Sequence, residues 1–166
     1  CVAERTKELA RERARFKFIF DSVPVGISLV AVDDVKAHLF NPAHESITGV
    51  LARESDRPDV FKHATHPDDY RRQMELAQPF IRREVDHYSI EKRYLRHGGV
   101  VWVVLTSRRF VDAETGIEQS ITTLVDITER KRAEEASRES EERFSGAFEH
   151  APIGVALVSP DGHWLR

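Results

Sequence analysis

A segment that occurs twice constrains this chain more than any other feature of its sequence. Residues 16–30 read FKFIFDSVPVGISLV, and residues 144–158 read FSGAFEHAPIGVALV. Two phenylalanines, a proline, a glycine and a Leu-Val pair recur at a constant separation of 128 residues, from Phe16 to Phe144. A repeat of this length corresponds to a whole domain with its connector. Because the chain begins at Cys1, we expect an excerpt of a longer protein that holds one complete domain and the opening of a second.

A charged stretch precedes each copy of the repeat. Between residues 129 and 143, eleven of fifteen side chains are charged, and Gly, Pro and β-branched residues are absent. This composition favours a helix, which we predict over 128–143, with a second helix over 1–22. In that second helix, apolar residues recur every seven positions, at Val2, Leu9 and Phe16. Sparse heptads of this kind pair weakly, so we expect a homodimer formed through the linker helices together with the folded domain, and a weak one for this chain.

Composition and charge narrow the classes of partner. The chain is 40% hydrophobic and 32% charged, with a net charge of −3 and interspersed acids and bases, so it lacks the basic surface expected for nucleic acid. The longest apolar runs are well short of a membrane span, although the full protein could have one elsewhere. The single cysteine, Cys1, points to a reducing compartment, and we expect a cytoplasmic protein.

The pattern of the body predicts two strands, then helices, then three strands. Residues 26–32 and 37–40 are strand-like around a turn at Asp33-Asp34, and Asn41-Pro42 opens a short helix that ends at Gly49. A second helix begins at His66-Pro67, with Tyr70, Met74 and Ala77 as its buried stripe. Strands over 88–95, 100–110 and 117–127 follow as an antiparallel meander. The predicted fold class is α+β, with helices on one face of a five-stranded antiparallel sheet.

These segments resemble a PAS domain with its C-terminal PAC motif. The resemblance rests on FDSVPVGISLV, NPAHESITG, HPDDY, YSIEKRYLRHGGVVWV and LVDITERKRAEE, of which the last two are the most specific. It implies a linker helix over 1–22, a PAS/PAC domain over 23–127, a signalling linker helix over 128–143, and a truncated second PAS domain over 144–166.

The resemblance also implies a function in bacterial signal transduction. PAS domains are similar to the input modules of sensor histidine kinases, diguanylate cyclases and cyclic-di-GMP phosphodiesterases. We therefore expect a sensory or relay module that is not itself an enzyme and passes a conformational change through its C-terminal helix to a downstream output domain. The alternative is a ligand-free dimerisation spacer.

Motifs for catalysis are absent from the sequence. It has no Gly-rich phosphate loop, nucleophile elbow, paired metal cysteines or His-Glu-x-x-His. The closest approach to a metal site is His63 and His66 with Asp68 and Asp69, a set better explained by the start of a helix. We predict no catalytic residues and no metal site.

The cofactor is left open by the sequence. A covalent flavin adduct needs a cysteine inside the domain, and the only cysteine is Cys1, so we expect no covalent cofactor. Haem needs an axial ligand in the central helix, which has no histidine between residues 68 and 78, so we do not expect haem. Non-covalent flavin or a small metabolite remains compatible with an apolar pocket between helices and sheet. The candidate pocket residues, which could equally pack a closed core, are Leu29, Leu39, Phe61, Met74, Tyr88, Ile90, Trp102, Val104 and Leu124.

Asp126, Ile127 and Thr128 stand where the last strand meets the linker helix. A rearrangement of the sheet would reach the helix first at these residues, so we predict that they form the signal junction. We expect the Thr128 hydroxyl to cap the helix by accepting from backbone N–H groups. The same residues could simply end a strand and begin a helix.

Overall fold

The computed structural model describes residues 2–31, 34–55, 57, 59–149 and 159–161. The chain divides into two units, Cys1–Thr128 and Glu129–Arg166. The first unit contains α1 (Val2–Ser22), β1 (Gly26–Ala31), β2 (Asp34–Phe40), α2 (Pro42–Thr48), the 3-10 helix η1 (Ala52–Glu54), α3 (Val60–Ala64), α4 (Pro67–Ile81), β3 (His87–Arg96), β4 (Gly99–Val111) and β5 (Glu118–Asp126). The helix α5 (Thr128–Glu149) follows.

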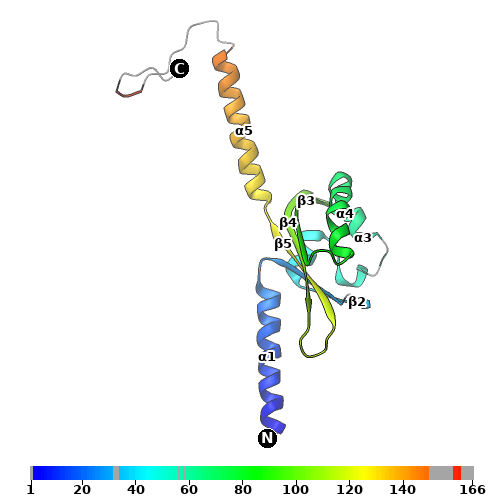
Figure 1. Ribbon diagram of the computed structural model, residues 1–166. Coiled ribbons are helices and arrows are strands. Elements are labelled where there is room, and N and C mark those ends of the chain that lie inside the picture. The colour runs from blue at the N-terminus through cyan, green and yellow to red at the C-terminus, as the bar shows by residue number, and fades with distance from the viewer. Residues whose placement is uncertain (1, 32–33, 56, 58, 150–158, 162–166) are drawn as a thin grey trace. The chain divides into compact units, whose positions relative to one another are not determined.

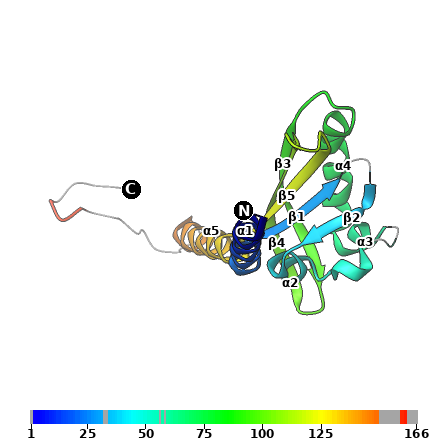
Figure 2. The ribbon, with the colours of Figure 1, turned by 90° about the horizontal axis from the view of Figure 1, so that it is seen from below.

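Five antiparallel strands form one sheet in the order β2-β1-β5-β4-β3. The helices α2, α3 and α4 pack against one face of it (Figures 1 and 2). The predicted α+β fold with a five-stranded antiparallel sheet is therefore confirmed. The first and last strands, β1 and β5, are neighbours in the sheet, and Gly26 pairs with Leu124.

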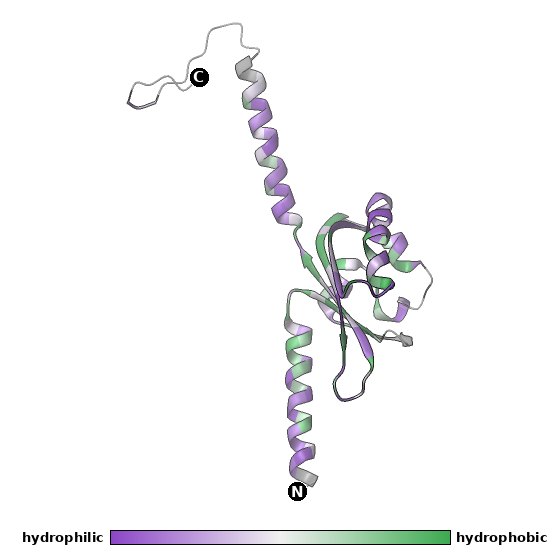
Figure 3. Cartoon of the chain, in the orientation of Figure 1, coloured by the Kyte–Doolittle hydropathy of each residue, from purple (hydrophilic) through white to green (hydrophobic). Residues whose placement is uncertain are grey.

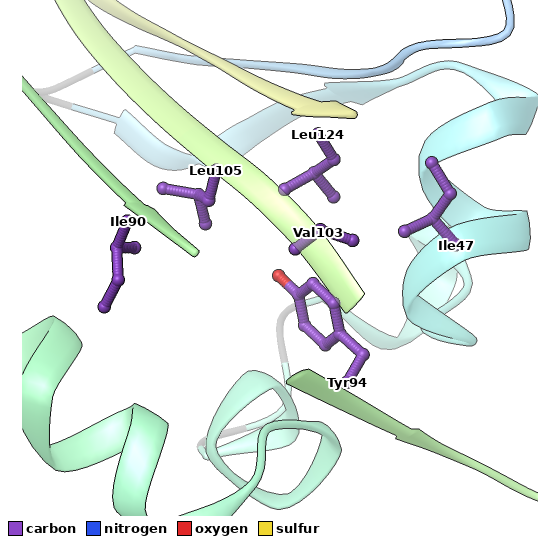
Figure 4. Close-up of a cluster of buried hydrophobic side chains, with 6 residues drawn as sticks. All are labelled: Ile47, Ile90, Tyr94, Val103, Leu105 and Leu124. Atoms are coloured by element: carbon purple, nitrogen blue, oxygen red, sulfur yellow. The ribbon is translucent and has the colours of Figure 1, made fainter. Parts of the chain in front are cut away.

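The hydrophobic core lies between this face of the sheet and the helices. Strand register brings Leu105 opposite both Ile90 and Leu124, and Val103 is also fully buried. Figure 4 shows these side chains gathered with Ile47 and Tyr94 beside β4. Because side chains alternate between faces along a strand, the residues between them point to the opposite face of the sheet.

Local signals in the sequence account for the ends of α2. Asn41 is its N-cap, and Asn41 Oδ1 accepts from His44 N at 2.9 Å. Pro42 occupies the first helical position, where its missing N–H costs nothing. Gly49 ends the helix with φ +74°, a left-handed conformation that favours glycine.

Asn41 also connects α2 to the elements before it. The side chain is fully buried; its Nδ2 donates to Phe20 O at 3.0 Å and to Val25 O at 2.8 Å, and its Oδ1 accepts from Ile27 N at 2.8 Å. One amide thus holds together the end of α1, the start of β1 and the start of α2.

Several element boundaries differ from the sequence-based ones. The second strand is longer than predicted because Asp34, assigned to a turn, instead begins β2, while residue 33 lies outside the described residues. The predicted linker helix continues beyond residue 143 to Glu149, and Gly146 does not end it. Most of the second repeat copy, residues 150–158, also lies outside the described residues.

The two long helices differ in hydropathy (Figure 3). Helix α1 exposes large apolar side chains at Phe16, Phe18 and Ile19, whereas α5 is mostly hydrophilic. Ion pairs one turn apart run along α5, such as Arg130 with Glu134 at 2.7 Å. Among the helices in the described part of the chain, none combines the length and apolarity that a membrane span requires.

Candidate functional site

A cavity of about 350 Å³ lies between the helical layer and the sheet. The sheet contributes residues from all five strands, because each strand directs alternate side chains to this face. The facing wall comes from α2, α3 and α4 and the segment before α3. The lining residues are Ser28, Val30, Phe40, His44, Arg57, Asp59, Val60, Phe61, Lys62, Thr65, Tyr70, Gln73, Met74, Tyr88, Lys92, Tyr94, Leu105, Ser107 and Thr122.

Lys92 places a buried ammonium group on the wall of this cavity. Its side chain, 1% exposed, donates from Nζ to Gln73 Oε1 at 2.8 Å and to Thr65 Oγ1 at 3.1 Å. The ammonium also lies 4.0 Å from the centroid of the Tyr94 ring. Burial lowers the pKa of Lys92 to about 7, against the opposing charge of Asp69. Within the described residues, no carboxylate oxygen lies within 4.0 Å of Nζ.

The Asp69 carboxylate forms its ion pair with Arg93 and not with Lys92. Arg93 donates to the Asp69 carboxylate from Nε at 2.7 Å and from NH2 at 2.9 Å, and its backbone N–H donates at 2.8 Å. These bonds hold the pKa of Asp69 below its usual value. Charge-assisted, bidentate pairs of this kind are strong and fix geometry. The acid whose charge acts on Lys92 is therefore committed to another cation.

His44 supplies a second buried nitrogen to the cavity. The ring is 3% exposed, stacks on Phe40 with centroids 4.3 Å apart, and meets Phe61 edge-on at 6.0 Å. Burial, and then the charge of Lys92, lowers the pKa of His44 to about 4, so the imidazole is neutral at pH 7. Its Nδ1 is buried without a hydrogen-bond partner among the described residues. An orphaned polar atom in a cavity wall indicates a missing partner.

The structure brings together some of the nine predicted pocket residues and separates others. Phe61, Met74 and Tyr88 line the cavity. Ile90 and Leu124 are buried in the adjacent hydrophobic cluster.

The remaining four predicted pocket residues do not line this cavity. Leu29, Trp102 and Val104 alternate with inward-facing residues along their strands and so lie half-buried on the opposite face. Leu39 alternates with Phe40 and is 46% exposed beside α1. The direction in which each strand residue points explains these placements. Both faces of β4 are apolar in sequence, so composition could not show which of its residues face the cavity.

Sequence reasoning missed Lys92 and His44. It assigned Lys92 no role, although the alternation of Ile90, Lys92 and Tyr94 along one strand places Lys92 on the buried face. It considered His63 and His66 as a pair, while the histidine in NPAHESITG received no role. That histidine stands one turn after the Asn41 cap, on the face of α2 that meets the sheet.

The histidines of the predicted helix start have structural partners. His66 caps α4, accepting at Nδ1 from Asp68 N at 3.4 Å, and His63 Nδ1 lies 2.9 Å from Asp59 O. Over the described ranges, no group of three or more His, Cys, Asp or Glu side chains could hold a metal ion.

The junction after β5 is built differently from the sequence-based expectation. Thr128 Oγ1 accepts from the backbone N–H of Trp102 at 3.0 Å, so the predicted capping role of its hydroxyl is wrong. Asp126 Oδ1 instead accepts from Thr128 N at 2.8 Å. Between them, Ile127 is 9% exposed and donates from its N–H to Trp102 O at 2.9 Å. The Thr128 hydroxyl thereby takes the place of a backbone carbonyl and extends the hydrogen bonding between β4 and β5 by one further bond.

A short series of contacts links the cavity wall to this junction. Lys92 and Arg93 are adjacent on β3 and point to opposite faces. The Arg93 guanidinium lies 5.2 Å from the Trp102 ring centroid, a cation–π distance. Trp102 pairs with Arg93 across the β3–β4 ladder, and its backbone holds Ile127 and Thr128. Two neighbouring strands, β3 and β4, thus connect Lys92 in the cavity wall with Thr128.

Comparison with known proteins places this fold in a family. A family model described as the PAS fold matches residues 14–140. The probable diguanylate cyclase DgcE of Escherichia coli (strain K12) is 29% identical over 154 residues, which span 92% of this chain and 14% of that protein.

Solved structures agree on the fold. A sensory box histidine kinase/response regulator from Burkholderia thailandensis E264 has a TM-score of 0.55 at 23% identity, covering 79% of this chain and 98% of that one. The PAS domain of an HTR-like protein from Haloarcula marismortui has a TM-score of 0.53 at 19% identity, covering 75% and 99%. Strand order, helical layer and family match agree, and the chain belongs to the PAS fold family.

Proposed function

We propose that this chain is a sensory or relay PAS module in which a small molecule bound in the cavity changes the state of helix α5 and, through it, a downstream output domain. The observation that carries the proposal is the series of contacts from Lys92 through Arg93 and Trp102 to Thr128. A ligand that moves β3 relative to β4 would alter the hydrogen bond from Trp102 N to Thr128 Oγ1, which positions the start of α5. The module itself is regulatory, without catalytic residues.

The output domain is proposed from the relatives. The chain spans 14% of the diguanylate cyclase relative, so the activity of the whole protein is not carried over with the domain. That relative favours a cyclic-di-GMP enzyme, a cyclase or phosphodiesterase, in a bacterial cytoplasm, with a sensor histidine kinase as the second candidate. The repeat that begins at Phe144 supports a second PAS domain between this module and the output domain.

A homodimer through the linker helices completes the proposal. Phe16 and Ile19 lie one turn apart on α1 and expose 53% and 51% of their surface, while Phe18 exposes 72% on another side of the helix. Solvent-exposed apolar side chains of this size favour a partner helix. In α5 the apolar contribution is small, so the dimer is expected to depend mainly on α1. Sedimentation of the chain, compared with a Phe16→Ser and Phe18→Ser double variant, measures this contribution. Equal monomer–dimer behaviour of the two proteins would refute it.

The alternative function, a ligand-free dimerisation spacer, does not require a conformational change to pass from the cavity to α5. Thr128→Val tests this difference, because valine keeps the size of threonine but cannot accept from Trp102 N. The matched control is Thr123→Val, within β5, the strand that leads to Thr128. In the full-length protein, Thr128→Val is expected to change the rate of cyclic-di-GMP formation from GTP, or of autophosphorylation from ATP, while the control does not. Identical output from both variants and the wild type would favour the spacer.

Insertions in α5 test transmission through the helix. Each helical residue turns the chain by about 100°, so two added residues rotate the downstream segment by about 200°, whereas seven restore the phase to within about 20°. We expect two alanines after Arg138 to change output strongly and a seven-residue insertion to leave it near wild type. Equal output from both insertions would show that α5 is a passive tether.

A further inference from the structure

We propose that the cavity binds a small monocarboxylate with a compact apolar body, whose carboxylate lies against Lys92 Nζ and His44 Nδ1. This inference rests on the proposed function in that it names the class of ligand for the same cavity. It is carried by the juxtaposition of a buried ammonium that has no carboxylate in contact and a buried imidazole nitrogen that has no partner, both within the described residues.

The charge of the wall selects for an anion. A buried ammonium is costly unless an opposite charge compensates for it, and the two oxygens that Lys92 contacts are neutral. Asp69, the acid that acts on Lys92, already accepts three hydrogen bonds from Arg93. A ligand carboxylate would supply the missing charge, while a cationic ligand would meet like charge.

Both nitrogens can serve one carboxylate. Lys92 and His44 line the same cavity and interact electrostatically, since the charge of Lys92 contributes to the low pKa of His44. A neutral imidazole carries one N–H, and in the tautomer with the proton on Nδ1 that orphaned atom becomes a donor. Lys92 is the one buried cation among the described residues that line the cavity, since Arg57 and Lys62 are exposed, and one buried positive charge matches a monocarboxylate better than a doubly charged phosphate.

The rest of the cavity defines the ligand body. Phe40, Phe61, Met74 and Leu105 provide apolar and aromatic surface. On the sheet side, Ser107 and Thr122 share a 2.7 Å hydrogen bond, which uses one of their two hydroxyl hydrogens. A volume of about 350 Å³ lies at the small end of ligand-binding cavities, which suits a compact aromatic or branched acid.

Carboxylate binding should depend on pH because the ammonium must be protonated. The titratable groups around Lys92 are Asp69 on α4, His44 on α2 and Tyr94 on β3, and the cavity is also lined by Arg57, Asp59, Lys62, Tyr70 and Tyr88. Arg93 lowers the pKa of Asp69, and burial raises that of Tyr94, so neither changes charge between about pH 6 and about pH 9. His44, with its pKa near 4, is neutral throughout this range. Affinity should therefore fall as pH rises above the pKa of Lys92 in the complex.

The test uses this chain with phenylacetate, benzoate, isovalerate and indole-3-acetate as probes, and phenylacetamide as a neutral match. Calorimetric titration at about pH 6 and about pH 9 is expected to detect at least one of the acids, with weaker binding at the higher pH, and no binding of the amide. Lys92→Met should weaken the binding of that acid by about tenfold to a hundredfold, because a hydrogen bond to a charged group is lost. The control Lys62→Met, at an exposed lysine of the same cavity, should not.

Several results would overturn the inference. They are the absence of binding by all four acids, equal binding of acid and amide, or a larger effect of Lys62→Met than of Lys92→Met. His44→Phe, which preserves the stack on Phe40, is a second variant in case Lys92→Met does not fold, and unchanged binding by it would remove His44 from the site. Binding without any change in full-length output would refute the relay function alone, and phase-dependent output without acid binding would refute this inference alone.

Discussion

Replacement of Lys92 by methionine should change how the stability of the domain depends on pH. In the folded chain the pKa of Lys92 is about 7, whereas the ordinary value is 10.5. At about 1.4 kcal/mol per pKa unit, this gap corresponds to about 5 kcal/mol by which burial disfavours the charged form. Methionine has a similar length and no charge, so the variant lacks this contribution.

The sign follows from the order of the two pKa values. Between pH 7 and pH 10.5 the unfolded chain holds the proton and the folded chain does not, so the free energy of unfolding rises with pH. Below pH 7 both states are charged, and the full cost of burial is present. From about pH 6 to about pH 9, the wild type should gain about 3 kcal/mol relative to Lys92→Met.

Urea unfolding followed by circular dichroism at the two pH values measures this difference. The variant also leaves Gln73 and Thr65 without their donor, but that cost does not depend on pH and cancels in the comparison. Lys62→Met, at an exposed lysine, is the control and should keep the wild-type slope. Parallel pH dependence in the wild type and Lys92→Met would mean that water reaches the ammonium in the folded domain, and the reasoning would fail.

Three further substitutions test the supports of the fold by urea unfolding. Asn41→Ala removes four hydrogen bonds and should cost about 3 kcal/mol or more, and a loss below about 1 kcal/mol would contradict the role of this buried amide. Gly49→Ala should cost about 1 kcal/mol, because φ is +74° and the added carbon would lie 2.9 Å from Arg96 Nε; an unchanged midpoint would oppose this. Asp69→Asn should lower the free energy of unfolding at neutral pH. Because Arg93 lowers the pKa of Asp69 in the folded domain, the stabilisation from the charged carboxylate is lost as the pH falls through that pKa, and the stability difference between the variant and the wild type should shrink in acid.

The order of elements could be predicted from the sequence because each boundary has a local cause. Asn41-Pro42 and His66-Pro67 each place a cap before a proline, and both begin helices in the structure. The predicted end of the first short helix at Gly49 is also confirmed. The start of β2 could not be predicted, since an Asp-Asp pair is as compatible with a turn as with a strand edge.

The cavity was only partly predictable. Aromatic and sulfur-containing side chains such as Phe61 and Met74 suggested an apolar wall, and they line the cavity. The polar groups that give it chemical character depend on tertiary packing, because a lysine becomes buried only when the helical layer closes over its strand. The role of Thr128 was also beyond local reasoning, as its partner Trp102 lies 26 residues earlier in the chain.

The pairing of β1 with β5 has a mechanical consequence. The chain enters the sheet at Gly26 and leaves it at Asp126, and Gly26 pairs with Leu124, so both ends lie at the same end of one antiparallel ladder. A pulling force applied through the two linker helices would load the hydrogen bonds one after another, as in a zipper, and not all at once in shear. In a tandem array under tension, this domain would therefore open from its two connectors inward at low force, and Asn41 and the Trp102–Thr128 rung would be among the first contacts strained.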